Sequence, residues 1–397
     1  MPRFIYTVRD NKGSKQTGAM HAEDESNLEE KLADSGYFLI SLKKDKAYEA
    51  RKNVKLKEKQ KINFTRNLAS LLQGGLTLAE SIKGLIYDAK DPQIIAILTD
   101  ISHHVEAGGT LAGALRHHPR TFSEFYIATI ASGESTGALG KTIEQLSNHL
   151  EWKQDLRKKI IELSIYPAII IILMSVLISG LFIFILPKFQ AIFSELGSEL
   201  PIATQMAMQA SGIFSSYWYL IFGFLFLVIA GTIFALKNPK IRFIYDKYKL
   251  RLPIFGKLIY DVNMSKFVRS MELCLKNGIT ILTTLELAEN SLGNIYLKNS
   301  VQKIKESVGV KGDLTTAFSL VGTFPNNLVR MIHVGESGGS LFAAFEKARA
   351  YYDKEIPHRM QAIFAILEPL LIILMGVIIG SLALVVILPL VQMMNVV

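Results

Sequence analysis

The hydrophobic positions of this chain of 397 residues form two patterns, namely long uncharged runs and amphipathic helical stripes. Three runs carry no charge, and each has about the twenty residues that a helix needs to cross a hydrocarbon core of roughly 30 Å. One such run could be a buried helix of a soluble protein. Three in one chain predict three membrane-spanning helices, which we place at residues 166–187, 217–236 and 366–389. The last begins just before the uncharged run from Pro369 and includes Glu368.

The amphipathic pattern occurs twice. The stretch "FTRNLASLLQGGLTLAESI" from Phe64 aligns with "FVRSMELCLKNGITILTTL" from Phe267 at an offset of 203. In both copies, apolar residues recur at the i, i+4, i+7, i+8 spacing that lays one buried stripe along a helix. The stripes consist of Phe64, Leu68, Leu71 and Leu72 in the first copy, and of Phe267, Met271, Cys274 and Leu275 in the second.

Turn and cap signals follow each stripe at equivalent positions. Gly75 and Gly278 are expected to end the helices, and Thr77 and Thr280 to cap the next ones. In the first copy alone, Glu80 completes a T-x-x-E capping box. A later joint places Thr110 and Asp313 at the N-cap position of a further helix.

After a deletion of one residue the offset becomes 202, and the alignment continues as far as Pro187 and Pro389. The chain is therefore a doubled unit, in which a helical bundle is followed by a membrane span. We expect a mainly α polytopic membrane protein with homologous bundles at 64–165 and 237–365.

A small appendage precedes the bundles. Residues 1–45 alternate like strands around one helical segment and predict a β-β-α-β unit. The linker at 46–63 belongs to the basic stretch Lys43–Lys61, which holds nine basic and three acidic residues. It is interpreted as a solvated linker, with contact to anionic lipid or an acidic partner as the alternative.

The distribution of Lys and Arg predicts the orientation in the membrane. Residues 1–165 hold 24 of them and residues 237–368 hold 19, whereas residues 188–216 hold only Lys188. Because basic residues near span ends stay on the cytoplasmic side, the N-terminus and both bundles are expected in the cytoplasm of a multi-pass inner-membrane protein. The loop at 188–216 and the tail at 390–397 are then periplasmic. The start "MPRFIYTVRD" lacks the apolar core of a signal peptide, so the first span would direct insertion.

The candidate chemistry is a G-x-S-x-G motif that occurs twice, in "GESTGAL" and "GESGGSL". In hydrolases this motif marks a serine nucleophile between a strand and a helix, but here the flanking segments favour helices. We interpret the motif as a turn in which the first glycine closes a helix, the serine bonds amides of the next helix, and the last glycine permits a tight bend. Such a turn would expose its glutamate as a candidate partner contact. The residues are Gly133, Glu134, Ser135, Gly137, Gly335, Glu336, Ser337 and Gly339.

Other candidate sites are weaker. Adjacent histidines on a helix point about 100° apart, and the second copy has no equivalents, so no metal site is expected and solvent exposure is favoured for His103, His104, His117 and His118. The lone Cys274 excludes an intramolecular disulfide and is interpreted as a buried, inert thiol. Candidate bundle–membrane junctions are formed by Tyr166, Pro167, Glu368 and Pro369.

The net charge of +9 is explained mostly by orientation, and no nucleic-acid-binding motif accompanies it. No G-x-x-x-x-G-K-[ST] loop is present, so ATP hydrolysis would fall to a partner and no cofactor is expected. Two other function classes stay open. A membrane-surface serine hydrolase would use the G-x-S-x-G motif, and a transporter subunit would need more polar residues within the spans than Ser175, Ser179, Thr232 and Ser381.

Several motifs together resemble the inner-membrane platform proteins of type IV pilus assembly and type II secretion. They are "FIYTVRDNKGSKQTG", the paired "FTRNLASLLQGG" and "FVRSMELCLKNG", both glycine-serine turns, "YPAIIIIL", "EPLLIILMG" and the loop "IFSELGSELPIATQ". The second copy departs from the first by having Glu368 in place of Tyr166. The resemblance implies a non-enzymatic platform that binds a hexameric cytoplasmic ATPase, pilins or pseudopilins and other inner-membrane assembly proteins. Binding to itself, as a homo-oligomer, is expected because "GLFIF" and "GVIIGSLAL" place small residues where helices could approach closely. A pilus, a secretion pseudopilus and a competence pilus all fit.

Overall fold

In the computed structural model, the described residues are 3–9, 13–21, 25–34, 36–44, 55–180 and 231–394, with isolated positions between 183 and 230. The chain divides into two compact units. Unit 1 comprises Met1–Trp152 together with Leu273–Leu287, and unit 2 comprises Lys153–Glu272 together with Ala288–Val397. Each unit is described by itself.

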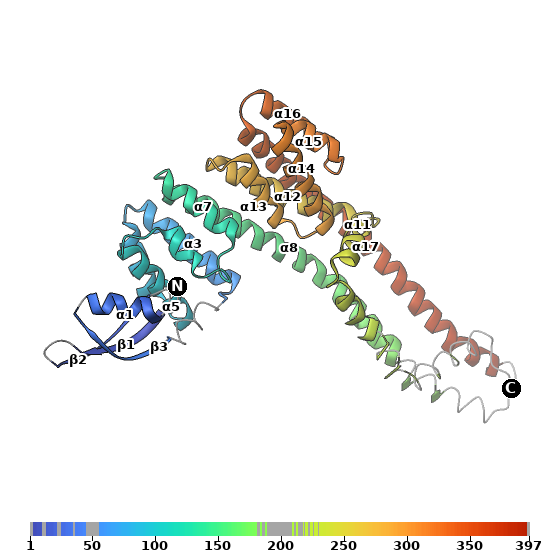
Figure 1. The fold of residues 1–397 in the computed structure, drawn as a ribbon. Coiled ribbons are helices and arrows are strands. Elements are labelled where there is room, and N and C mark those ends of the chain that lie inside the picture. Colours follow the sequence, from blue (N-terminus) through green and yellow to red (C-terminus); the bar gives the residue numbers. More distant parts are fainter. Residues whose placement is uncertain are drawn as a thin grey trace. The chain divides into compact units, whose positions relative to one another are not determined.

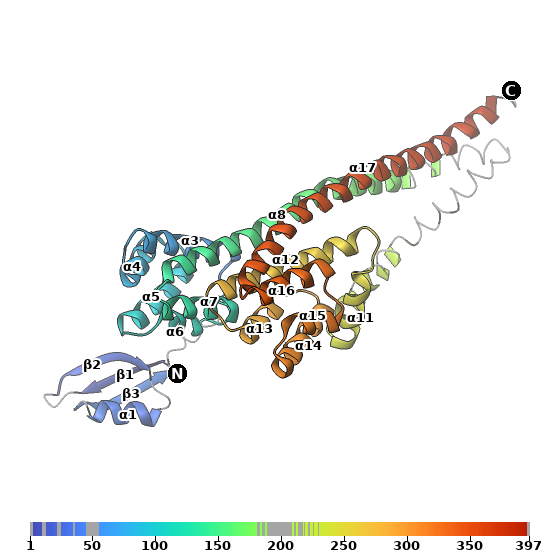
Figure 2. The same cartoon turned by 90° about the horizontal axis from the view of Figure 1, so that it is seen from above.

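The N-terminal part of unit 1 is a small sheet with one helix on its face (Figures 1 and 2). The chain runs β1 (Arg3–Arg9), β2 (Lys15–His21), α1 (Glu25–Asp34) and β3 (Phe38–Lys44). The strands are antiparallel in the order β2-β1-β3. Side chains four residues apart on a strand share a face, so β1 turns two apolar residues towards α1. The buried core is Phe4, Val8, Leu28 and Leu32. This arrangement confirms the predicted β-β-α-β order.

The first helical bundle surrounds the predicted apolar stripe. Phe64 and Leu68 are buried, and Leu71 and Leu72 pack against the same core. The core also takes in Ile101, Ile130 and Leu146, which come from three other helices of the bundle. The helices are α3 (Glu58–Gln73), α4 (Leu78–Asp88), α5 (Pro92–Glu106), α6 (Leu111–Arg116), α7 (Glu124–Ser135) and α8 (Leu139–Gly180).

The joint between α3 and α4 has the predicted geometry. Gly75 adopts a left-handed φ of 88°, which a residue with a side chain rarely adopts, and this ends α3. Thr77 then caps α4, because its hydroxyl accepts a hydrogen bond from the Glu80 amide at 3.3 Å. In return, the Glu80 carboxylate accepts one from the Thr77 amide at 2.9 Å. The capping box is confirmed.

The second repeat has the same order of helices, and its residues 273–287 belong to unit 1. Phe267, Met271 and Cys274 of the second stripe are fully buried. Within unit 2, the Phe318 ring lies 6.1 Å from that of Phe267 and 4.8 Å from that of Phe324. The helices are α11 (Pro239–Lys249), α12 (Phe255–Lys276), α13 (Ile281–Ser291), α14 (Ile295–Lys311), α15 (Leu314–Val321), α16 (Asn326–Ser337) and α17 (Leu341–Met394).

Charged pairs join α12 to α17 inside unit 2. Arg359 Nε lies 2.6 Å from Asp261 Oδ2, and an Arg269 nitrogen lies 2.6 Å from Asp353 Oδ1. Asp261 is buried, and this burial raises the pKa of its carboxyl to about 6 despite the neighbouring Arg359 guanidinium. Burial of the charge therefore outweighs the attraction of its partner.

The helices α8 and α17 are long and apolar enough to cross a membrane. The apolar part of α8 is not covered by any of the residues that the structure describes, since Ile172 is 62% exposed and Val176 65% exposed. A core helix of a soluble protein would be covered, so these exposed surfaces suit lipid. The third predicted span lies within α17, and the first begins in α8, which ends at Gly180. The described positions of 217–236 are helical as far as Ala235, with gaps at 218, 221, 222, 225 and 229, whereas most of the loop 188–216 lies outside the described residues.

The candidate junctions lie within continuous helices. Tyr166 and Pro167 are inside α8, and Glu368 and Pro369 are inside α17. The side chains of Tyr166 and Glu368 are exposed. Each bundle thus runs into its apolar helix without a break at either proline.

Candidate functional site

Each G-E-S-x-G segment forms the last turn of a helix and the bend that follows it. Gly137 and Gly339 adopt left-handed φ angles of 69° and 71°. The Ala138 amide donates to the Gly133 carbonyl at 2.9 Å, and the Ser340 amide donates to the Gly335 carbonyl at 2.8 Å. This six-to-one bond with a left-handed glycine is a Schellman C-cap. The predicted tight bend is confirmed in both copies.

Gly133 and Gly335 do not close their helices as predicted, because α7 ends at Ser135 and α16 at Ser337. Both glycines are buried within the last turn of their helices. A methyl group on Gly133 would lie 2.7 Å from Thr142 Cβ, and one on Gly335 would lie 2.5 Å from Ala344 Cβ. The absence of a side chain therefore lets α7 approach α8, and α16 approach α17.

Glu134 and Glu336 are turned into their bundles. The Glu134 carboxylate accepts hydrogen bonds from the Leu111 and Ala112 amides, the latter at 2.9 Å. The Glu336 carboxylate accepts them from the Leu314 and Thr315 amides, at 2.7 and 2.9 Å.

These amides open α6 and α15, and the start of a helix has unpaired N–H groups and a positive dipole end. The expectation that the turn exposes both carboxylates is corrected, since the side chains are half-buried and hold the bundle together.

Ser135 and Ser337 are exposed, as are the glycines that follow them at 137 and 339. The Ser135 hydroxyl donates to the Ser132 carbonyl at 2.9 Å, so it does not bond an amide of the next helix as predicted. A helix rather than a β-strand precedes each serine. This geometry differs from that of a nucleophile elbow, in which a strand delivers the serine to a strained turn.

The predicted caps beside the turn behave differently in the two copies. Thr110 caps α6, because its hydroxyl accepts from the Gly113 amide at 3.0 Å. Asp313 instead accepts from the Thr316 hydroxyl, while Glu336 takes the first amides of α15. The Thr316 bond lowers the pKa of Asp313.

The expectation of solvent exposure is confirmed for His103 and corrected for the other three histidines, because His104 and His117 are half-buried and His118 is buried. His118 is buried, and its Nε2 lies 2.9 Å from Asp100 Oδ2. The rings of His104 and His117 lie 5.1 Å apart, and His103 is exposed. Among the described residues, no three metal-ligating side chains cluster. Cys274 is buried as predicted, and burial raises the pKa of its thiol to about 12.

Comparison with known proteins places both bundles in one family. Residues 64–187 and 267–389 each match the family model "Type II secretion system (T2SS), protein F". Residues 1–43 match "Type II secretion system protein F, N-terminal domain". The chain belongs to the type II secretion system protein F family. The duplicate match confirms the internal repeat and makes each bundle with its following apolar helix one copy of the family domain.

Relatives in this family bear two kinds of name. The chain is 30% identical to the type IV pilus assembly protein PilC of Pseudomonas aeruginosa, over 84% of this chain and 90% of that relative. It is 30% identical to PilC of Thermus thermophilus, over 96% and 95%. It is 26% identical to the type II secretion system protein F of Vibrio cholerae, over 100% and 99%.

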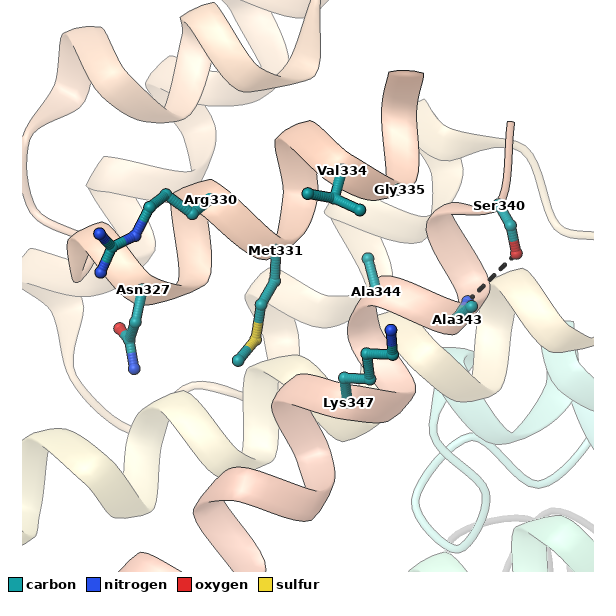
Figure 3. Close-up of a pocket in the computed structure, with 9 residues that line it drawn as sticks. All are labelled: Asn327, Arg330, Met331, Val334, Gly335, Ser340, Ala343, Ala344 and Lys347. Atoms are coloured by element: carbon teal, nitrogen blue, oxygen red, sulfur yellow. Dashed lines mark hydrogen bonds between the residues drawn. The ribbon is translucent and has the colours of Figure 1, made fainter. Parts of the chain in front are cut away.

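One feature of the second family domain was not predicted from the sequence. A groove of about 450 Å³ lies between α16 and α17, directly beside the glycine-serine turn (Figure 3). Its walls are mostly apolar, with two cationic side chains among them. It is lined by Asn327, Arg330, Met331, Val334, Gly335, Ser340, Ala343, Ala344 and Lys347. We call it the α16–α17 groove.

Proposed function

We propose that this member of the protein F family is the inner-membrane platform of a type IV filament assembly machine, a pilus or a secretion pseudopilus. In this role it couples a cytoplasmic hexameric ATPase to the insertion of pilins into the filament base. The observation that carries the proposal is the duplicated family domain, in which each bundle continues into a long apolar helix.

The continuous helices suit a mechanical coupling. At a rise of about 1.5 Å per residue, the 42 residues of α8 extend over roughly 63 Å. A helix of this length passes a tilt or rotation of its bundle into the membrane. The sequence has no phosphate-binding loop, so the energy for such a movement comes from the partner ATPase.

The excess of Lys and Arg before 166 and after 236 supports cytoplasmic bundles, with the segment 188–216 and the C-terminal tail in the periplasm. The exposed apolar faces of α8 and α17 suit lipid, pilin helices, other inner-membrane assembly proteins or a second copy. The junctions at Tyr166–Pro167 and Glu368–Pro369 and the glycine-serine turns are the places where we expect a movement to be relayed. No nucleic-acid partner and no cofactor are included in the proposal.

The proposal is tested by deleting the gene in its native host and counting surface filaments. Loss of filaments, with the pilins still present in the membrane, is expected, and the wild-type gene restores them. Affinity purification of the full chain in detergent is expected to recover the assembly ATPase of the same cell. Normal filament numbers in the deletion strain would rule out a platform role.

Variants of the glycine-serine turn distinguish a structural role of the turn from catalysis by its serine. Gly137→Val and Gly339→Val force a side chain into a left-handed conformation, so they are expected to impair filament assembly. The pair Ser135→Ala and Ser337→Ala leaves that conformation intact and is expected to have a mild effect, with no fluorophosphonate labelling of the wild type. Abolished assembly in the serine pair, at normal membrane levels, would favour the hydrolase alternative.

A further inference from the structure

In the first family domain, the site equivalent to the α16–α17 groove is occupied by another turn of the chain. There, between α7 and α8, it holds the turn that follows α12. The Ser132 hydroxyl donates to the Asn277 carbonyl, and the Thr142 hydroxyl donates to Asn277 Oδ1 at 2.7 Å. Asn277 Nδ2 donates to Gln145 Oε1 at 3.1 Å. All of these residues belong to unit 1.

The same three positions in the second domain line the open α16–α17 groove. At the offset of 202, Ser132, Thr142 and Gln145 correspond to Val334, Ala344 and Lys347. Figure 3 shows Val334 on α16, with Ala344 and Lys347 on α17. Val334 is 66% exposed, although it is a large apolar side chain. The α16–α17 groove thus lies at the equivalent place but lacks the two hydroxyl groups and the amide group that bond Asn277 in the first domain, with Val334, Ala344 and Lys347 in their positions.

In the first domain, the turn equivalent to the Asn277 turn is the one that follows α3. At the offset of 203, Asn277 corresponds to Gly74. The two turns have the same backbone, because Gly75 and Gly278 have φ angles of 88° and 76°. Each turn is closed by an equivalent bond, from the Leu76 amide to Leu71 at 3.2 Å and from the Ile279 amide to Cys274 at 3.0 Å. A groove that fits one turn in shape therefore fits the other.

The α3–α4 turn is exposed where its equivalent is covered. Leu76 is 43% exposed, and Gly74 and Gly75 are also exposed, whereas Ile279 and Asn277 are half-buried. The chain therefore carries an exposed apolar residue on this turn and an open apolar groove of the kind that accepts it.

The differences between the two grooves match the differences between the two turns. Asn277 has a polar side chain and meets three polar groups, whereas Gly74 has no side chain and its groove offers Val334 and Ala344 in their place. The α16–α17 groove also carries two cations, Arg330 and Lys347, and none of its nine lining residues is acidic. The end of a helix carries the negative end of its dipole, and the last turn of α3 contains no basic residue. The charges are therefore complementary.

We propose that the α16–α17 groove binds the α3–α4 turn of a second copy of this chain. The open groove and the exposed turn are different surfaces of the chain. The contact is therefore heterologous and links copies head to tail into a ring or an open row. The contact is small, but confinement of the copies to one membrane raises their effective concentration. The inference goes beyond the proposed function and does not depend on it.

The test is a disulfide crosslink between differently tagged full-length chains, co-expressed in native membranes. One chain carries Leu76→Cys and the other Val334→Cys, both at exposed positions. The native Cys274 is buried and does not compete. Mild oxidation is expected to give a covalent dimer with both tags, at twice 44.3 kDa. The matched control replaces Val334→Cys by Leu320→Cys, which is also at a position 66% exposed, and is expected to give at least tenfold less dimer.

A groove-filling variant gives a second measurement. Ala343→Trp in the Val334→Cys chain places a large side chain in the groove and is expected to reduce the dimer at least fivefold. Equal dimer with Leu320→Cys would indicate random collision and overturn the proposal. The absence of any crosslink would also overturn it. So would an intramolecular crosslink in a variant that carries both Leu76→Cys and Val334→Cys on the same chain. Filament counts are measured separately, so failure of this contact is distinguishable from failure of the platform role.

Discussion

Replacing Glu134 is the most direct test of how the first bundle is held together. Its single carboxylate accepts hydrogen bonds from both the Leu111 and the Ala112 amides at the start of α6. Hydrogen bonds to a charged group contribute about 1.5–3 kcal/mol each, and partial exposure of Glu134 reduces this. Glu134→Ala is therefore expected to cost about 2–4 kcal/mol. The helix α6 has six residues, too few to be stable alone, so the loss acts first on this segment.

The assay is hydrogen exchange of the full-length protein in detergent, read by mass spectrometry on peptides that cover 109–116. A loss of about 2 kcal/mol corresponds to roughly 30-fold faster exchange of the Leu111 and Ala112 amides. Glu134→Gln keeps one acceptor oxygen and is expected to show a smaller change. The control Glu144→Ala removes an exposed carboxylate of the same bundle and is expected to leave exchange unchanged. Unchanged protection in Glu134→Ala would refute the role of this carboxylate as the cap of α6.

Three further predictions concern packing, thiol chemistry and pH. Gly335→Ala forces a methyl group to 2.5 Å from Ala344 Cβ and is expected to destabilise the protein by about 1–3 kcal/mol in thermal unfolding. Gly309→Ala, in open space on α14, is expected not to destabilise it, and equal effects would contradict the close approach at Gly335. Cys274 is expected to resist N-ethylmaleimide at pH 7.5 until the protein is denatured, since burial raises its pKa to about 12, and rapid native labelling would contradict that burial. The pKa of Asp261 is raised from 3.8 to about 6, so between about pH 4 and pH 6 the folded state binds more protons at this carboxyl than the unfolded state does. The contribution of Asp261 to stability therefore falls as pH rises from about 4 to 6. The melting temperature of Asp261→Asn relative to wild type should therefore rise over that range, and a relative fall would show that Arg359 dominates instead.

Local patterns were sufficient to predict much of the fold. The stripe through Phe64 and Leu68 predicted a buried helix face, and Thr77 with Glu80 predicted a capping box, because these interactions join residues three or four positions apart. The two repeats were found for the same reason, since each carries its own local signals. The middle span at 217–236 remains a prediction.

The candidate site was harder to predict, because its main contacts join distant parts of the chain. Glu134 bonds amides 22 and 23 residues away, and no local spacing indicates this. From the sequence, Gly133 was predicted to end a helix. In the structure a glycine is needed there because Thr142, from another helix, leaves no room for a side chain. His118 appears solvent-exposed until the fold brings Asp100 to it. The signal that could have revealed the α16–α17 groove was the replacement of Ser132 and Gln145 by Val334 and Lys347 between aligned copies.

The central claim is that both copies of the bundle lie on the cytoplasmic side of the membrane. It is tested most directly by labelling single cysteines with a membrane-impermeant maleimide in intact and in permeabilised cells. Tyr87→Cys and Val310→Cys report on the two bundles, since these positions are 91% and 86% exposed, and Ser198→Cys reports on the segment 188–216. We predict that the bundle cysteines react only after the inner membrane is permeabilised, and that the Ser198→Cys thiol reacts in intact cells. Labelling of either bundle in intact cells would contradict the account.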